Sequence, residues 1–112
     1  MSDLFESDLS YRGNVPVVHL RGEITSDAEE ALFGRYEEIP QEKRSRVVLD
    51  FGETRYINSS GIAILIQLIT RASDARNRIE FVSLSPHFRK VMDIVGLTDF
   101  VQIHENLADA LS

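Results

Sequence analysis

Residues 47–68, which read VVLDFGETRYINSSGIAILIQL, restrict the possible folds more than any other part of the chain. Residues 47–51 are a near-continuous apolar run, typical of a central strand that is covered on both faces. From Ser60 to about Arg76 the pattern predicts a helix that is apolar on most of its circumference. Because exposing each of its isoleucines to water would cost about 1.5 to 3 kcal/mol, this helix has to lie against the sheet. The two segments together indicate an α/β domain with a parallel-type sheet.

The segment before this unit predicts a hairpin. Gly13-Asn14 is a common two-residue hairpin turn, and the stretch after it, with Val15, Val17, Val18 and Leu20, is typical of a strand. Pro16 suits an edge strand or the first position of a strand, since proline cannot donate to a strand ladder. Gly22 breaks the pattern, and the strand is expected to end there.

An amphipathic helix is expected next. Ser26 is a suitable N-cap, Glu29 stands at the capping-box position three residues on, and Pro40 predicts an end at about Ile39. Residues 52–58 are interpreted as a loop that leads from the central strand to the apolar helix.

The last third of the chain alternates strands and helices. Ser85 is a suitable N-cap, Pro86 follows at the first helical position, and Gly96 is placed where a helix ends in a left-handed residue. Strands are expected over residues 79–84 and 100–103, and a final helical turn or two over residues 106–111.

Composition excludes several classes of protein. The 12 Lys and Arg against 18 Asp and Glu give a net charge of −6, which argues against direct binding to nucleic acid. Without cysteine the chain has no disulfide, thiolate zinc site or cysteine nucleophile. The histidines, His19, His87 and His104, show no metal-binding spacing. We therefore expect neither a metal nor a cofactor.

The chain is expected to be one domain over residues 1–112, with about the first eight residues flexible. No apolar segment is long enough to cross a bilayer, and the start MSDLFESDLS has neither a basic nor an apolar signal region. These features predict a cytoplasmic protein that does not bind membranes.

Two serines stand where the apolar helix begins. Ser59 lies at or next to the N-cap, so its hydroxyl is close to amide donors that lack partners within the helix. The helix dipole stabilises an anion there by about 0.3 to 1 kcal/mol. This local chemistry leaves two interpretations open, a simple helix cap and a modified or reactive serine.

Motifs for enzyme chemistry are missing around these serines. A nucleophile elbow needs glycine two residues before the serine, and neither Ser59 nor Ser60 has it. A phosphate-binding loop needs a lysine after a glycine-rich run, and residues 52–56 contain none. Asp50 and Glu53 are interpreted as surface or loop groups rather than an acid pair. His19 and His87 have no neighbour in sequence that would make either a base, so no enzyme activity is expected.

The segment Asn58-Ser59-Ser60-Gly61-Ile62, which follows an apolar strand and about seven loop residues, resembles the signature loop of the STAS domain family. It is most similar to the single-domain anti-sigma factor antagonists of that family. Two further segments resemble the family: Gly22-Glu23-Ile24, similar to its Gly-Glu-Leu segment, and residues 84–97, similar to its third-helix region. The likeness runs from about Leu9 to Leu111 in the same order. It implies a mixed four- to five-stranded sheet with about four helices packed largely on one side.

The resemblance also implies a phosphorylation-controlled partner switch. Ser59 would be phosphorylated by a serine kinase that is also the anti-sigma factor. The unphosphorylated form would bind that kinase and free the sigma factor, and a PP2C-type phosphatase would reverse the modification. A phosphoserine adds about −1.5 to −2 charge, which opposes docking in an apolar contact.

The resemblance implies partner contacts around the Gly-Glu-Ile segment and around the serine motif. They are Glu23, Thr25, Ile57, Asn58, Ser60, Gly61, Ile62 and Leu65. Ile57, Gly61, Ile62 and Leu65 are interpreted as the apolar part of the docking patch, and Gly61 as a position where a partner backbone can approach.

The chain departs from the family pattern at two positions. Asn58 and Thr25 stand where many members have Asp, and Asp27 is a candidate substitute for the second, with a first-turn helix acid as its alternative role. Two other functions remain as alternatives. One is a STAS scaffold or partner-switch module that controls a phosphatase, secretion or transport system, and the other is a small hydrolase using Ser59 or Ser60.

Overall fold

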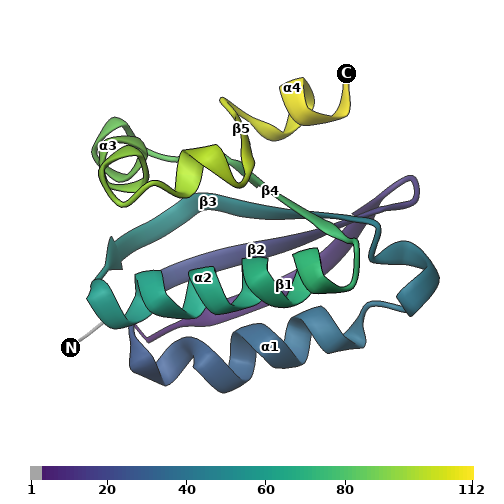
Figure 1. The fold of residues 1–112 in the computed structure, drawn as a ribbon, viewed down its shortest axis with the longest axis horizontal. Helices are drawn as coiled ribbons and strands as arrows, with labels where there is room; N and C mark the ends of the chain where they lie inside the picture. The colour runs from purple at the N-terminus through teal and green to yellow at the C-terminus, as the bar shows by residue number, and fades with distance from the viewer. Residues whose placement is uncertain (1–3) are drawn as a thin grey trace.

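The computed structural model describes residues 4–112 and contains one five-stranded sheet in the order β1-β2-β3-β4-β5. The strands are β1 (Glu6–Arg12), β2 (Val15–Ile24), β3 (Arg46–Ile57), β4 (Arg78–Val82) and β5 (Gln102–His104). β1 and β2 form an antiparallel hairpin, whereas each later strand joins its neighbour in parallel. The expected mixed sheet is thus confirmed, and the apolar run of residues 47–51 lies in its central strand (Figure 1).

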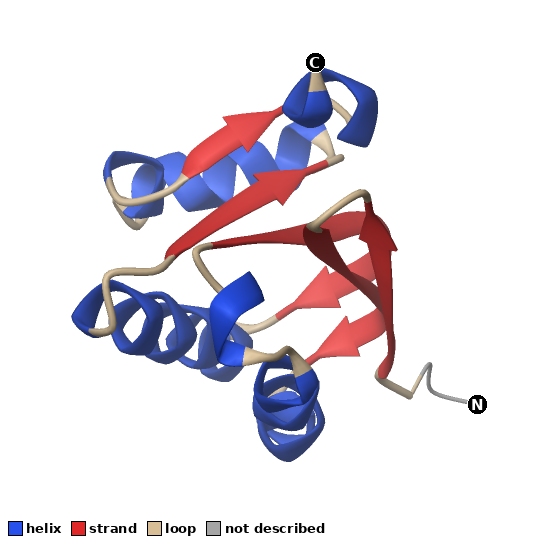
Figure 2. Ribbon diagram, turned by 90° about the vertical axis from the view of Figure 1, so that its right-hand side faces the viewer, coloured by secondary structure: helices blue, strands red, loops and turns tan. Residues whose placement is uncertain are grey.

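Within the described residues, four α-helices accompany the sheet. They are α1 (Glu29–Glu38), α2 (Ser59–Asp74), α3 (Pro86–Ile94) and α4 (Leu107–Leu111). α1 and α2 lie side by side on one face of the sheet (Figure 2), and α4 packs on the other. No helix in residues 4–112 is long and apolar enough to cross a bilayer.

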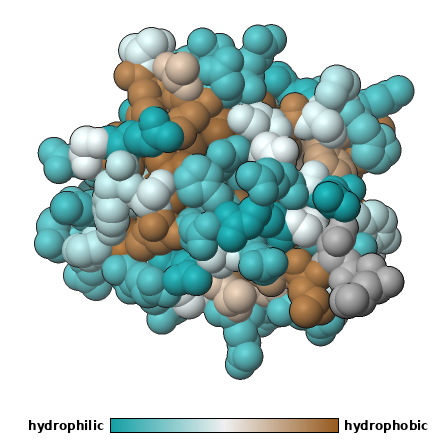
Figure 3. Space-filling model, turned by 180° about the vertical axis from the view of Figure 1, so that it is seen from behind, coloured by the Kyte–Doolittle hydropathy of each residue, from teal (hydrophilic) through white to brown (hydrophobic). Residues whose placement is uncertain are grey.

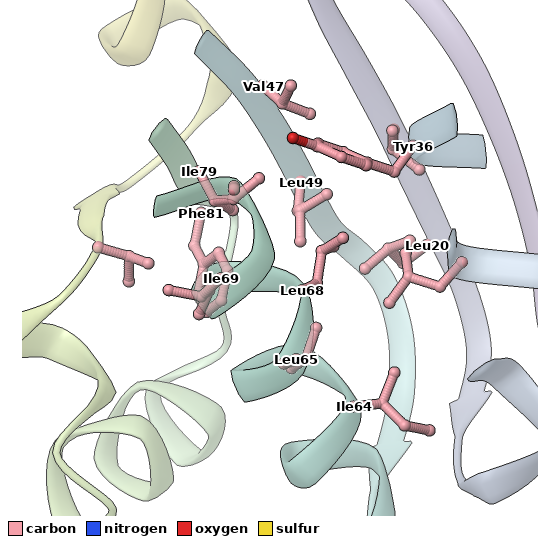
Figure 4. Close-up of a cluster of buried hydrophobic side chains, with 14 of the residues drawn as sticks. Leu20, Tyr36, Val47, Leu49, Ile64, Leu65, Leu68, Ile69, Ile79 and Phe81 are labelled. Atoms are coloured by element: carbon pink, nitrogen blue, oxygen red, sulfur yellow. The ribbon is translucent and has the colours of Figure 1, made fainter. Parts of the chain in front are cut away.

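The main core lies between the sheet and α1 and α2. Side chains of α2, among them Leu65 and Leu68, point into a cluster that includes Leu49 of β3 (Figure 4). Phe51 and Phe81 meet edge to face there, with ring centroids 4.8 Å apart. Because successive strand residues point to opposite faces, the apolar run of β3 supplies both sides of the sheet.

The opposite face has a small apolar strip beside polar clusters. Val17, Val48 and Val82 pack against Ala110 of α4. Most of the surface seen from behind is hydrophilic, with separate apolar patches (Figure 3). The helices therefore cover one face much more fully than the other, in agreement with the expectation that they pack largely on one side.

Glu80 anchors the polar cluster beside α4. Its side chain is 1% exposed and accepts hydrogen bonds from Arg46 at 2.8 and 3.0 Å, and from His104 at 3.0 Å. Arg78 forms an ion pair with it at 2.9 Å, and Arg46 also donates to the carbonyl of Ala110. Burial by itself raises the pKa of Glu80, but the hydrogen bonds and charges of these partners lower it below its ordinary value. The cluster joins β3, β4 and β5 to the C-terminal helix.

Two expected strand ends are wrong. β2 continues through Gly22, which has a φ of +87°, and β3 continues through residues 52–57, which the sequence suggests are a loop. The two strands stay paired to Ile24 and Ile57, with register shifts on the way. Pairing with a neighbouring strand thus overrides the local turn signals. Pro16 is tolerated inside the sheet because pairing of β2 with β3 begins only at Val17.

The caps at the start of the first helical segment also differ from the prediction. Thr25, not Ser26, is the N-cap, and its hydroxyl accepts from the amide of Asp27 at 3.4 Å. Residues Ser26–Ala28 form a short 3-10 turn before α1, which ends before Ile39 and Pro40 as expected. The ends of α3 are confirmed: Ser85 accepts from the amide of Phe88 at 3.1 Å, and Gly96 is left-handed with a φ of +82°.

Three differences in the bounds of strands remain. β4 covers Arg78–Val82 rather than residues 79–84. β1 begins at Glu6, inside the first eight residues that are expected to be flexible, because hairpin pairing with β2 orders it. Residues 1–3 of that segment lie outside the described residues. β5 covers Gln102–His104 rather than residues 100–103, and Phe100 before it is 75% exposed.

Candidate functional site at the start of α2

The chain passes from β3 into α2 through a single residue, Asn58. Its backbone is extended, with φ −100° and ψ −178°, and its side-chain oxygen accepts from the amide of Gly61 at 2.8 Å. Its carbonyl accepts from the amide of Ile62 at 3.0 Å. Asn58 is therefore the N-cap, and Ser59 is the first residue of the helix. The interpretation of Ser59 as a simple cap is wrong, because Asn58 already fills that role.

Both serines are accessible. Ser59 and Ser60 are exposed, and no acidic side chain lies in the first turn of α2. Their positions place them beside the amide donors at the positive end of a 16-residue helix. An added anion on Ser59 would therefore be favourable for the helix that carries it.

Gly61 holds the start of α2 against the end of β2. A Cβ at this position would lie 2.0 Å from the carbonyl oxygen of Ile24 and 2.8 Å from its carbonyl carbon. The amide of Asn58 donates to the same oxygen at 3.3 Å. Gly61 is buried, so the interpretation that a partner backbone approaches it is wrong: the backbone that approaches is that of β2.

Leu65 is not part of a docking surface either. Its side chain is fully buried in the main core, where Figure 4 shows it pointing inward from α2. The expectation of an apolar patch with Leu65 in contact with a partner fails, because Leu65 lies on the face of α2 that packs against the sheet.

The other residues implied as contacts meet at one edge of the sheet. Glu23 pairs with Tyr56 and Ile24 with Ile57, so the carboxyl ends of β2 and β3 lie together beside the start of α2. The half-buried or exposed members of this group are Glu23, Thr25, Ile57, Asn58, Ser59, Ser60 and Ile62. Strand pairing thus brings the Gly-Glu-Ile segment and the serine motif together.

Tyr56 is a further candidate that the sequence reasoning missed. It is 49% exposed and pairs with Glu23 at the end of the strands. Exposed tyrosines are enriched among the residues that dominate protein interfaces. Its signal in the sequence is a large aromatic residue in an otherwise polar segment, two residues before Asn58.

His19 has partners that only the fold reveals. Its Nδ1 lies 2.9 Å from Asp50 Oδ2 and its Nε2 lies 3.0 Å from Ser10 Oγ, so its partners come from the two neighbouring strands and not from its neighbours in sequence. The second oxygen of Asp50 accepts from the amide of Gly52 at 2.9 Å, within β3. Three strands are tied together by this chain of hydrogen bonds.

The order of these groups is that of a Ser-His-Asp triad, but the surroundings do not suit acyl transfer. A cavity of about 100 Å³ beside His19 is lined by carboxylates, including Asp8 and Glu53, and its Arg21 is paired with Asp8. An oxyanion needs donors that point at it, not neighbouring carboxylates. Within residues 4–112, no histidine is hydrogen-bonded to Ser59 or Ser60, and no group of three or more His, Asp or Glu side chains could hold a metal.

The mixed sheet, the helices on one face and the exposed serine at the start of α2 define a domain of the STAS class. A family model described as "Mlab, STAS domain" matches residues 7–104. The chain belongs to this family.

Similar proteins include regulators. "Putative anti-sigma factor antagonist BtrV" of Bordetella bronchiseptica is 29% identical over 77 residues, which cover 69% of this chain and 66% of BtrV, slightly under two thirds of its length. An anti-sigma factor antagonist from Mycobacterium paratuberculosis has a TM-score of 0.82 at 22% identity, covering 99% of this chain and 96% of that one. The Bacillus cell fate determinant SpoIIAA in its phosphorylated form has a TM-score of 0.68 at 21% identity, covering 96% of each chain. These structural likenesses establish the fold.

Proposed function

We propose that this chain is an anti-sigma factor antagonist in a partner switch, with Ser59 as its phosphoacceptor. One observation carries the proposal: Asn58 caps α2, so the exposed hydroxyl of Ser59 is available at the positive end of the helix. The similarity to BtrV and to the anti-sigma factor antagonist from Mycobacterium paratuberculosis supports the same role. The chain then acts as a regulator in the cytoplasm and not as an enzyme.

The unphosphorylated form binds an anti-sigma factor that is a serine kinase, and this binding frees the sigma factor. Ile57, Ile62 and Tyr56 provide apolar and aromatic contact area around Ser59. Glu23 and Thr25, from the end of β2, provide polar contacts at its border. Gly61 and Leu65 support this surface from inside, because their packing sets the position of the first turn of α2.

Phosphorylation ends the binding through a local change of charge. The kinase moves the terminal phosphoryl group of ATP to the hydroxyl oxygen of Ser59, which adds about −1.5 to −2 charge at the centre of the contact. Removing that charge from water and placing it against a partner costs free energy, while the helix dipole leaves the fold of this chain intact. A PP2C-type phosphatase restores the binding form.

Phosphorylation of purified protein tests the acceptor. Incubation with the cognate kinase and ATP should add one phosphate by mass spectrometry, absent in Ser59→Ala and retained in the matched control Ser60→Ala. Phosphorylation of Ser60, or of neither serine, would show that Ser59 is not the phosphoacceptor.

Binding tests the switch itself. Ser59→Asp should weaken kinase binding about tenfold or more, whereas the neutral, similarly shaped Ser59→Asn should bind nearly as well as the wild type. Both variants should melt within about 2 °C of the wild type, since Ser59 is exposed. Equal binding by Ser59→Asp and wild type contradicts the interface. The same mixture of chain and kinase is then tested for release of a sigma factor. Release supports the role of anti-sigma factor antagonist, and its absence favours a partner switch that controls a phosphatase, secretion or transport system.

A further inference from the structure

A second apolar surface lies along α2, away from Ser59. A groove of about 330 Å³ runs between α2 and the segment that follows α3. Ile66 and Thr70 of α2 form one side, and Val95 and Phe100 form the other. Seven residues separate Ile66 from Ser59, which corresponds to about 10 Å along the helix. The groove is therefore a different surface from the phosphoacceptor site.

The groove exposes more apolar side chain than the fold requires. Phe100 is 75% exposed, and Ile66 and Val95 are 42% and 43% exposed. Ile94, next to Val95, is 75% exposed. Their neighbour Leu97 is buried and completes the core beneath them. Such a concentration of exposed large apolar residues is typical of a site where another protein binds.

Asp74, at the end of α2, is the charged residue among those that line the groove. Asp99, which precedes Phe100, lines the adjoining cavity, which shares Ile69, Ser73 and Phe100 with the groove. Within residues 4–112, neither Asp74 nor Asp99 forms an ion pair. The net charge of −6 adds a negative background. A ligand that fits this surface needs apolar groups with positive charges beside them.

We propose that the groove docks an amphipathic helix from a partner protein, with Leu- or Ile-type residues on one face and Lys or Arg at its border. Helices of this kind bind apolar grooves through side chains spaced three and four residues apart. A second copy of this chain is a poorer occupant, because a two-fold contact between two grooves would bring the Asp74 carboxylates of both copies to the same interface. Because the groove lies about 10 Å along α2 from Ser59, we expect it to bind its partner in both phosphorylation states.

A designed peptide provides the first test. A helical peptide of about 15 residues, with leucines at i, i+3, i+4 and i+7 and lysines beside them, is added to the isotope-labelled full chain. Its matched control replaces the lysines with glutamates. The lysine peptide should shift the amide resonances of residues 66–74 and 95–100 and bind about tenfold more tightly than the glutamate peptide. Equal binding of both peptides, or shifts confined to the start of α2, would overturn the proposal.

Variants of the chain provide the second test. Phe100→Ser should abolish the shifts, and Asp74→Asn should weaken lysine-peptide binding about threefold or more. Leu4→Ser, at a residue that is 78% exposed and lies outside the groove, should leave binding unchanged. Ser59→Asp should also bind the peptide normally, so this result does not depend on the phosphoacceptor. Dimerisation of the free chain that Phe100→Ser abolishes would identify a second copy as the occupant and refute the proposal.

Discussion

Replacing Gly61 by alanine tests how closely α2 packs on β2. The added Cβ would lie 2.0 Å from the carbonyl oxygen of Ile24, whereas ordinary contacts begin near 3.4 Å. The first turn of α2 or the end of β2 must then move by about 1.4 Å, which is the difference between these two distances. The displaced oxygen also accepts from the amide of Asn58, so the movement strains that hydrogen bond.

Three contributions set the expected change in the free energy of unfolding. Overpacking costs about 1 to 3 kcal/mol, and the weakened hydrogen bond costs about 1 kcal/mol. Alanine has a higher helix propensity than glycine, which offsets about 1 kcal/mol of this loss. The net destabilisation for Gly61→Ala is thus about 2 kcal/mol, or a fall in Tm of about 8 °C for a domain of this size.

Thermal and urea unfolding measure this change, and Gly34 in α1 provides the matched control. A Cβ at Gly34 would meet no atom within 4 Å, so Gly34→Ala should gain about 1 kcal/mol from helix propensity alone. Gly61→Ala should also weaken partner binding, because Ser59 and Ser60 move with the first turn. If Gly61→Ala were as stable as Gly34→Ala, the close contact with Ile24 would be wrong.

Two further substitutions address the cap and the buried carboxylate. Asn58→Ala should lower the free energy of unfolding by about 1 kcal/mol in urea, whereas Ser59→Ala should change it by less than about 0.5 kcal/mol; the reverse order would show that Ser59 is the cap. Glu80→Gln should cost about 3 kcal/mol at pH 7, since it leaves Arg46 without its buried carboxylate. Because the pKa of Glu80 is lowered in the folded protein, its contribution is present above its ordinary pKa and is lost as the pH falls through the folded value. The gap between wild type and Glu80→Gln, measured by urea unfolding across pH, should therefore narrow below about pH 4; a gap that is independent of pH contradicts this role.

Much of the fold follows from sequence signals between residues only a few positions apart. The capping serine Ser85 and the left-handed Gly96 set the ends of α3, as the sequence predicts. The second half of β3, residues 52–57, is harder to predict, because Gly52 and the polar residues after it are typical of a loop. Their extended conformation depends on pairing with β2, which no local pattern reports.

The candidate site shows the same division. The motif around Ser59 predicts an exposed serine at the start of a helix, and the structure places it there. The roles of its neighbours could not be predicted, since they depend on which side of α2 meets the sheet. Gly61 accommodates the carbonyl of Ile24, and Leu65 fills the core.

The α/β class, the family and the place of the serine could be predicted from the sequence, because apolar periodicity, caps and a contiguous motif are properties of neighbouring residues. The pairing of His19 with Asp50 and of Arg46 with Glu80 emerged from the folded chain, since these partners lie 31 and 34 positions apart. The fold also divides the apolar residues of α2 between a buried side and an exposed groove. Contacts between distant segments depend on the order of strands in the sheet, and that order is a property of the whole fold.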